Sequence, residues 1–190
     1  MENSSNNEEL LFEGKTFEII KKNFISGEKS SKIEIARRSP GVRLIIVKDN
    51  KMLITKEFRF ELNDYDYRLP GGKVFDSLKE YKEALMKDSD ILKHATEAAK
   101  KECLEETGLI AKNIKHFLTA NAGLTVKWDL FYFIVDDFEE NEKGQQLGFD
   151  EEIYVGWKTF DEVKELCLNN EIGEYRSVGV ILSYILKNEK

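Results

Sequence analysis

The stretch "AAKKECLEETGLI", residues 98–110, decides the fold, because three carboxylates lie within five positions and a glycine follows at once. On an α-helix, Glu102, Glu105 and Glu106 are spaced i, i+3 and i+4, so their side chains share one face. Like charges at this spacing repel by about 0.2–0.5 kcal/mol per pair. Neighbouring lysines on a solvated face can offset this repulsion, and so can a divalent cation with oxygen ligands. Taken alone, this glutamate stripe (Glu102, Glu105 and Glu106) is typical of a solvated face. The flanking segments have to decide between a solvated face and a metal site.

Before this stretch, the chain has the patterns of paired β-strands. "TFEIIKKNF" (16–24) and "SSKIEIARRS" (30–39) are rich in β-branched residues and flank a Ser-Gly-Glu-Lys turn. "VRLIIVKDNKMLITKEFRF" (42–60) predicts a hairpin, because two apolar strands meet at Asp49-Asn50, a pair typical of tight turns. "YRLPGGKV" (67–74) predicts a strand that enters a Pro-Gly-Gly turn, where backbone faces a ligand.

Helical spacing runs over residues 77–107, with an expected break near "KDSD" (87–90), and Gly108 suits a helix-ending position with positive φ. The remaining elements are expected to be a strongly apolar strand, an acidic loop, a strand and a last, interrupted helical region: residues 125–138, 139–152, 153–159 and 160–186. Strands that flank a central helix, with helices at the end, indicate an α/β sandwich rather than repeated βα units.

The composition excludes several classes of partner. A net charge of −7 offers no basic surface for nucleic acid or an anionic membrane, although an acidic protein can bind a phosphorylated small molecule through cations. No apolar run approaches the roughly 20 residues of a membrane span, and the first residues lack the apolar core of a signal peptide. Cys103 and Cys167 make no disulfide framework, so we expect a cytoplasmic protein with reduced thiols.

With a Leu-Pro-Gly-Gly turn upstream and a helix-ending glycine downstream, the glutamate stripe resembles the signature of the Nudix hydrolase family. That signature is a Gly, a spacer and then Arg-Glu-apolar-x-Glu-Glu-x-Gly-apolar. Here Gly72 is followed by Lys101-Glu102-Cys103-Leu104-Glu105-Glu106-Thr107-Gly108-Leu109. The turn, the helix and its terminator match jointly, which is much more specific than any one of them. The resemblance implies a Nudix-type α/β/α sandwich within the α/β (α+β) class.

The resemblance is strongest to the ADP-ribose pyrophosphatases and covers about residues 15–187. In that subfamily, a small N-terminal β subdomain precedes the Nudix fold and commonly exchanges across a homodimer. We therefore expect a disordered tail (1–14), a strand subdomain (15–40) and a hydrolase domain (41–190) with an inserted segment at about 77–92. A homodimer is the expected assembly.

Three features depart from the family pattern. The inserted segment lengthens the path between Gly72 and the glutamate helix. The usual first Glu of the signature falls on Lys93, and the usual Arg is Lys101, a point charge instead of a planar fork. The proline that often marks ADP-ribose enzymes is absent, since its position falls at Ala122-Gly123. These departures leave the expected fold intact and the substrate open.

Mg²⁺ is the expected cofactor, with Mn²⁺ as an alternative ion, because Mg²⁺ takes oxygen ligands and shares its shell with substrate phosphates. A bound ion polarises a phosphoryl group and activates water. The resemblance implies these metal ligands: the Gly71 backbone carbonyl, Glu102, Glu105, Glu106 and Glu151. It also implies catalytic roles for Glu105, Glu106 and Glu151. Lys101, four residues before Glu105, is expected to position that carboxylate.

Three arginines are candidate substrate ligands. Arg59 in "KEFRFEL" resembles the family's phosphate-binding arginine, and a bidentate guanidinium suits a diphosphate. Arg68 is a second candidate. Arg38, or its neighbour Arg37, is expected to approach the nucleoside across a dimer interface. The alternative for each of these arginines is an ordinary surface charge.

The acidic loop is expected to hold the base that activates water. Asp150 or Glu152 is the candidate, because the closest family position falls on Phe149, which cannot accept a proton. The alternative is a loop that is acidic only because it is solvated. Three aromatic residues are expected in the core rather than stacked on a base: Phe58, Phe60 and Trp128.

The leading interpretation is a Mg²⁺-dependent hydrolase of a nucleoside diphosphate linked to another group, with ADP-ribose cleaved to AMP and ribose 5-phosphate. One alternative is the same chemistry on another nucleoside diphosphate sugar or on a nucleoside triphosphate. Another is a domain that binds ADP-ribose-like ligands without turnover, as a sensor. Lys93 and Lys101 favour the sensor, whereas the three glutamates of the stripe favour chemistry.

Overall fold

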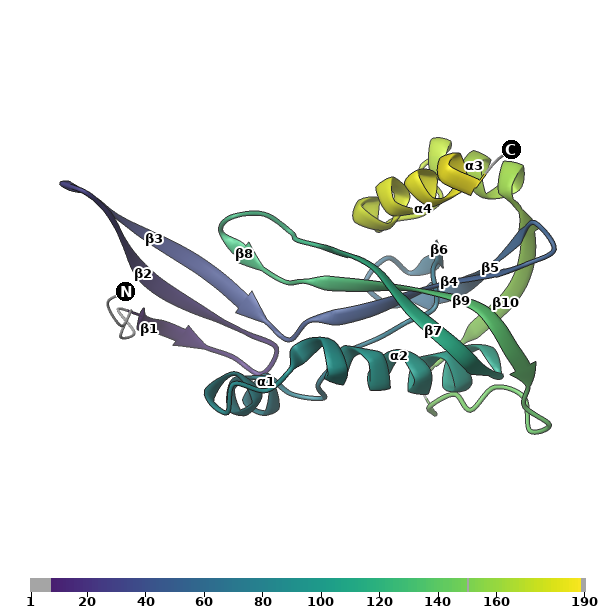
Figure 1. Cartoon of the computed structure of the whole chain (residues 1–190), viewed down its shortest axis with the longest axis horizontal. Helices are drawn as coiled ribbons and strands as arrows, with labels where there is room; N and C mark the ends of the chain where they lie inside the picture. Colours follow the sequence, from purple (N-terminus) through teal and green to yellow (C-terminus); the bar gives the residue numbers. More distant parts are fainter. Residues whose placement is uncertain (1–7, 150, 189–190) are drawn as a thin grey trace.

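The computed structural model describes residues 8–149 and 151–188, and these residues form two β-sheets and four helices (Figure 1). The larger sheet has the strand order β10-β5-β4-β9-β7, with β6 paired to β5. Its strands are β4 (Gly41–Lys48), β5 (Lys51–Arg59), β6 (Asp64–Arg68), β7 (Leu109–Ala120), β9 (Leu130–Glu140) and β10 (Ile153–Thr159). The helices are α1 (Leu78–Met86), α2 (Ile91–Thr107), α3 (Phe160–Leu168) and α4 (Tyr175–Asn188).

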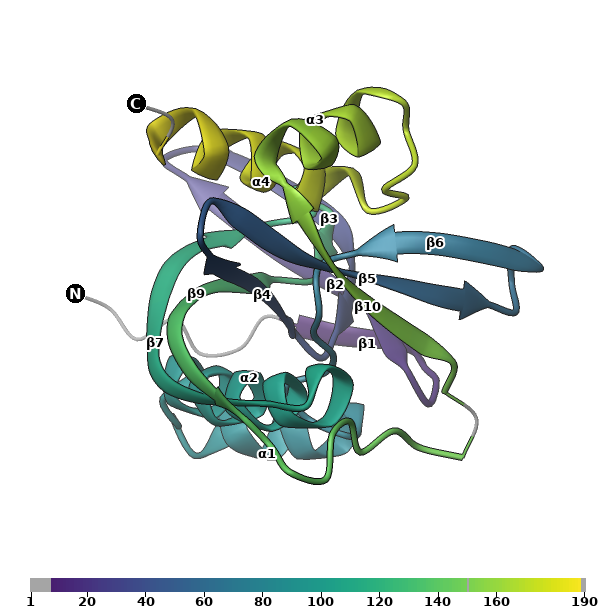
Figure 2. The same ribbon diagram turned by 90° about the vertical axis from the view of Figure 1, so that its right-hand side faces the viewer.

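Helices cover both faces of the larger sheet, as Figure 2 shows with α2 on one side and α3 and α4 on the other. Along β4, Leu44 and Ile46 point to the α2 side, where they pack with Ala95 and Ala99. Ile45 points the opposite way, into a second cluster formed with residues of α3 and α4. A strand buried on both faces reads as a continuous apolar run, which is the pattern of "LIIV". The predicted α/β/α sandwich is confirmed.

The expected hairpin and helix break are both present. Asp49 and Asn50 have φ values of 51° and 58°, so β4 and β5 are joined by the kind of tight turn that this pair favours. α1 ends at Met86, and the Asp90 side chain caps α2 by accepting the backbone N–H of Lys93. No helix in the described ranges is long and apolar enough to cross a membrane.

Gly108 ends α2 in the left-handed conformation, with φ of 70°, and its N–H donates to the Leu104 carbonyl. A side chain there would also meet the backbone of Gly144, only 2.8 Å from an added Cβ. Glycine is therefore required for two reasons, the backbone conformation and the close approach of the 141–146 loop. The abrupt end of the glutamate stripe is explained by both.

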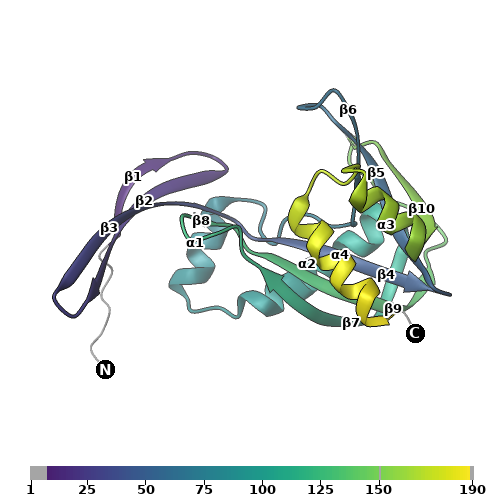
Figure 3. The same cartoon turned by 90° about the horizontal axis from the view of Figure 1, so that it is seen from above.

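The smaller sheet projects from the sandwich (Figure 3). Its strands run in the order β1 (Glu8–Glu13), β2 (Phe17–Ser26), β3 (Lys29–Arg38) and β8 (Val126–Lys127). The prediction of a disordered tail over 1–14 was wrong for residues 8–13, while residues 1–7 lie outside the described ranges. The polar composition misled, because Glu8 and Glu9 of β1 pair with Lys22 and Lys21 directly opposite on β2.

The inserted segment forms α1, which fastens the smaller sheet to the sandwich. Lys82 Nζ lies 3.0 Å from a Glu13 oxygen and 2.9 Å from Glu18 Oε2. Glu18 is only 1% exposed, and its other oxygen accepts a hydrogen bond from Arg37 Nε at 2.6 Å. Burial alone would raise the pKa of Glu18, but hydrogen bonds and charge from Lys82 and Arg37 lower it below its ordinary value.

We expect Lys82→Met to lower the free energy of unfolding by about 1–3 kcal/mol at pH 7, because Glu18 loses one of its two cations. The pKa of Glu18 is lower in the folded chain, so this ion pair stabilises above the unfolded value of 4.5 and is lost as the pH falls through the folded value. Urea denaturation at pH 7 and at pH 3 measures both effects. Lys79→Met, on the exposed side of α1, is the matched control. Equal destabilisation by both variants at pH 7 would contradict the role of Lys82.

Candidate functional site

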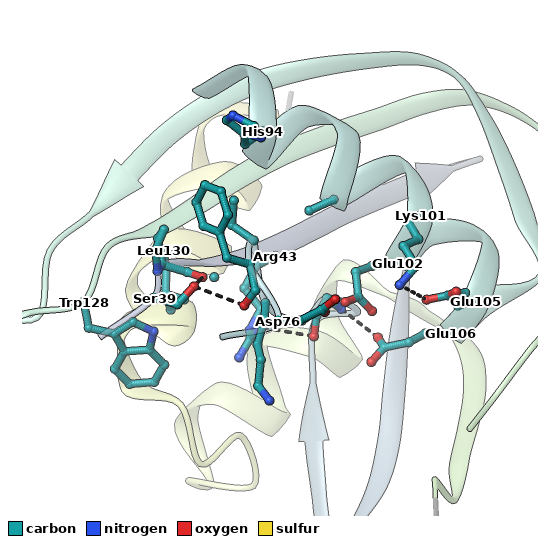
Figure 4. A pocket seen from close by; sticks show the side chains of 18 of the residues that line it. Ser39, Arg43, Asp76, His94, Lys101, Glu102, Glu105, Glu106, Trp128 and Leu130 are labelled. Carbon is teal, nitrogen blue, oxygen red and sulfur yellow. Dashed lines mark hydrogen bonds and ion pairs between the residues drawn. The ribbon is translucent and has the colours of Figure 1, made fainter. Parts of the chain in front are cut away.

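A cavity of about 710 Å³ opens between the Pro-Gly-Gly turn, α2 and the ends of β3, β5 and β9 (Figure 4). Its wall includes residues that are far apart in the sequence. Eight residues predicted to hold the metal or the substrate line it: Arg38, Arg59, Arg68, Gly71, Glu102, Glu105, Glu106 and Glu151. The structure therefore brings the glutamate stripe, the glycine turn and the candidate substrate arginines to one place.

The two glycines of the turn allow a close approach of backbone on two sides. Gly71 has φ of 141°, and a Cβ added there would collide with the Val42 carbonyl on β4. A Cβ on Gly72 would collide with the carboxylate of Glu102. The Gly71 N–H donates to Glu106 Oε2 at 2.7 Å. The turn thus holds the first and last glutamates of the stripe against its backbone.

Glu102 and Glu106 are carboxylates in an unfavourable electrostatic environment. Burial raises the pKa of Glu106 to about 8, and the charge of Glu102 adds to the shift, while the Gly71 N–H and Arg43 partly oppose it. Burial likewise raises the pKa of Glu102 to about 7, with further contributions from Glu105 and Glu151. Two buried carboxylates that repel each other favour the arrival of a proton or a cation.

Glu105 and Glu151 have other partners in this structure. Lys101 Nζ lies 3.5 Å from Glu105 Oε2, which confirms the predicted contact across one helical turn. Glu151 Oε2 accepts the backbone N–H of Gly148 at 2.8 Å. Both residues still lie on the cavity wall, and their charges act on Glu102.

These contacts bear on whether the site fits a metal ion. In the part of the chain that the structure describes, no group of three or more His, Cys, Asp or Glu side chains is arranged to hold one. The donor chemistry does fit, because Glu102 and Glu106 are hard oxygen ligands whose repulsion a cation would remove. Completing the shell requires Glu105 or Glu151 to turn from its present partner.

The candidate substrate arginines are paired with carboxylates. Arg59 Nη1 donates to Glu57 at 2.6 Å and Nη2 to Glu61 at 2.9 Å. Arg68 Nε donates to Asp66 at 2.6 Å. Glu57 was missed from the sequence, although it lines the cavity and its charge contributes to the raised pKa of Glu106. The signal was present, because residues two apart on a strand share a face and Glu57 lies two before Arg59.

Arg43 and Glu174 were also missed. They form a bidentate ion pair, with Nε–Oε2 at 2.8 Å and Nη2–Oε1 at 3.2 Å, and both side chains are less than 10% exposed. Arg43 Nη1 donates to the carbonyls of Val42, at 2.8 Å, and Gly71, at 3.1 Å. An arginine inside an apolar strand was the available signal, since a buried charge needs a partner.

Other predictions had mixed outcomes. Asp150 lies outside the described residues. Glu152 accepts hydrogen bonds from Tyr65 and Tyr154 and does not line the cavity. The core prediction was wrong for Phe60, which is 76% exposed. Phe60 is exposed because it lies in the turn that follows β5, outside the sheet. Trp128 packs, partly buried, against the core cluster on the α3 and α4 side and also lies on the cavity wall.

Comparison with known proteins identifies the fold. No family model matches the chain, and no curated protein does. A solved structure described as an ADP compounds hydrolase is similar, with a TM-score of 0.66 and 15% sequence identity. The match covers 98% of this chain and 97% of that chain. The similarity therefore includes the projecting sheet as well as the sandwich, and it establishes a shared architecture.

Proposed function

We propose that this chain is a Nudix-type, metal-dependent hydrolase that cleaves the pyrophosphate bond of a nucleoside diphosphate linked to another group. ADP-ribose is the first candidate substrate, with AMP and ribose 5-phosphate as products. The observation that carries the proposal is the convergence of eight residues, chosen from sequence, on one cavity. Hydrolysis is inferred from that cavity rather than from the fold, because one fold can host many functions. The name of the structural neighbour supports the choice of an ADP compound.

The side chains divide into two roles. Glu102 and Glu106, with Glu105, Glu151 and the Gly71 carbonyl, would hold Mg²⁺ or Mn²⁺, which supplies Lewis-acid polarisation and an activated water when bound. Arg43 keeps the Gly71 carbonyl in place through its 3.1 Å hydrogen bond. Arg59 and Arg68 offer guanidinium donors to phosphoryl oxygens, in exchange for their present carboxylate partners.

A sensor that binds the same ligand without turnover is the second candidate. It is favoured by the absence, within the described ranges, of a preformed group of three metal-binding side chains. Lys93 adds to this, because the residue at the usual glutamate position is exposed and does not line the cavity. Hydrolysis remains our first choice because the four carboxylates predicted as metal ligands all lie on the cavity wall: Glu102, Glu105, Glu106 and Glu151.

Incubation with Mg²⁺ and a panel of nucleoside diphosphate compounds, followed by mass spectrometry of the products, separates these candidates. We expect ADP-ribose to yield AMP and ribose 5-phosphate, and EDTA to abolish the reaction because the charge on the phosphoryl oxygens is no longer neutralised. Intact ligand that nevertheless raises the melting temperature would identify a sensor. Turnover of a different panel member would replace ADP-ribose as the substrate, and turnover in EDTA would exclude the metal.

We also propose a homodimer and a cytoplasmic location. Support for the dimer comes from large apolar side chains exposed on the projecting sheet, since a monomer rarely leaves such a surface in water. These side chains are Leu10, Leu11, Phe12, Phe17, Phe24 and Ile25. Sedimentation equilibrium at micromolar concentration measures the assembly.

A further inference from the structure

The end of the cavity away from the glutamates is cationic and aromatic. Figure 4 shows Trp128 and Ser39 at one end, the three glutamates of the stripe at the other and Arg43 between them. The guanidinium carbons of Arg38 and Arg176 each lie 4.2 Å from the centroid of the Trp128 ring. Two cations are therefore held against one indole by cation–π attraction.

These two arginines differ from the others in the chain. The sequence contains six arginines, all in the described ranges, and four of them pair with carboxylates: Arg37, Arg43, Arg59 and Arg68. Arg38 makes no hydrogen bond or ion pair with any described residue, and its Nε is buried without a partner. Arg176 uses Nη1 to donate to the carbonyls of Trp128, at 2.6 Å, and Ala120, at 3.5 Å, and its Nη2 is buried without a partner.

The charges at this end do not balance. Arg38 feels the positive charges of Arg43 and Arg176 and the negative charge of Glu174, so three positive charges meet one negative charge around it. Burial lowers the pKa of Arg38, and the charges of Arg176 and Arg43 lower it further. Buried charges in proteins are normally paired, because an unpaired one loses its hydration without compensation. An anion is what this end of the cavity lacks.

We propose that Arg38 and Arg176, held over Trp128, form a second anion subsite that binds a phosphate monoester or carboxylate group of the ligand. Arg38 lines the cavity, and its two Nη atoms, unlike Nε, are not buried, so they are open to a ligand. Trp128 restricts the guanidinium to one plane, which suits bidentate binding of a planar or tetrahedral anion. Arg176 supports the same anion with its charge and keeps the Trp128 backbone in place.

This subsite differs from the place proposed for the diphosphate. Arg59 and Arg68 lie beside Glu57, whose charge reaches Glu106, and thus belong to the glutamate end. The inference rests on the proposed function in one respect, which is that the diphosphate of the ligand binds at the glutamate end of the cavity. It adds that a nucleoside diphosphate compound with a further anionic group at its other end should be preferred over ADP-ribose, which carries no anion besides its diphosphate.

Anion binding can be measured without metal or turnover. The probes are inorganic phosphate and acetate, titrated in EDTA at constant ionic strength and followed by calorimetry and by melting temperature. We expect wild type to bind at least one of them, and Arg38→Met to weaken binding at least about tenfold, as expected for loss of a charge-assisted contact. Arg176→Met should weaken binding too, whereas Lys48→Met, an exposed charge outside the cavity, should not.

The outcomes test the anion subsite separately from the proposed hydrolase function. Tighter binding of phosphate than of acetate identifies a phosphate monoester as the anion, and the reverse order identifies a carboxylate. Failure of wild type to bind either probe overturns the subsite, as does unchanged binding in a folded Arg38→Met variant. Loss of binding in Arg59→Met alone would place the anion at the glutamate end, which also overturns it. Anion binding without hydrolysis of any panel compound keeps the subsite and rejects the proposed function.

Discussion

Glu106→Gln is expected to reduce kcat by about 10²–10³-fold or more while leaving the fold intact, because the charge that would hold the metal is removed. The glutamine oxygen can still accept the Gly71 N–H, so the contact between α2 and the turn remains. The metal-free variant should be at least as stable as wild type, since a carboxyl group whose charged form is disfavoured by burial and by the charge of Glu102 becomes a neutral amide. Steady-state kinetics with saturating Mg²⁺ and thermal melting in EDTA measure the two quantities.

Glu165→Gln provides the control for this variant. Glu165 is exposed on α3 and does not line the cavity, so its loss of charge should leave kcat unchanged. A Glu106→Gln protein with wild-type kcat would remove the glutamate stripe from the reaction. A large loss of stability would show that Glu106 is a structural residue.

Arg43→Met is expected to lower the free energy of unfolding by about 3–5 kcal/mol, because Glu174 would remain as a buried carboxylate without its cation. Burial alone would raise the pKa of Glu174, but the charge and hydrogen bonds of Arg43 lower it, so in wild type the carboxylate is ionised. For a chain of this length the melting temperature should fall by roughly 2–4 °C per kcal/mol. Urea denaturation at pH 7 measures the loss.

The double variant Arg43→Met/Glu174→Gln tests the cause. Removing both charges should recover part of the lost stability, since the penalty comes from the unpaired carboxylate. Arg43→Lys should be less stable than wild type and should lie closer to Arg43→Met than the double variant does. An ammonium cannot make the bidentate contact and also reach the Gly71 carbonyl. A single variant that costs under about 1 kcal/mol would show that water replaces the guanidinium.

The local sequence pattern was sufficient to predict structure where the residues that interact are adjacent in the sequence. The hairpin at Asp49 and Asn50, the break between α1 and α2, and the glycine that ends α2 were all predicted, because turns and helix ends are decided by a few adjacent residues. β1 was missed for the opposite reason. Its charged residues pair with lysines of β2 and α1, which its own composition does not reveal.

By itself, the sequence determined that Glu102, Glu105 and Glu106 share one face of a helix that stops at Gly108, because helical periodicity depends only on spacing. Tertiary structure alone decided which groups meet that face. Glu57, Arg43 and Glu174 come from two strands and a helix end, and strand register brings them together with the glycine turn. The same packing leaves Arg38 and Arg176 without a carboxylate, since charge balance in a cavity depends on distances between residues that lie far apart along the chain.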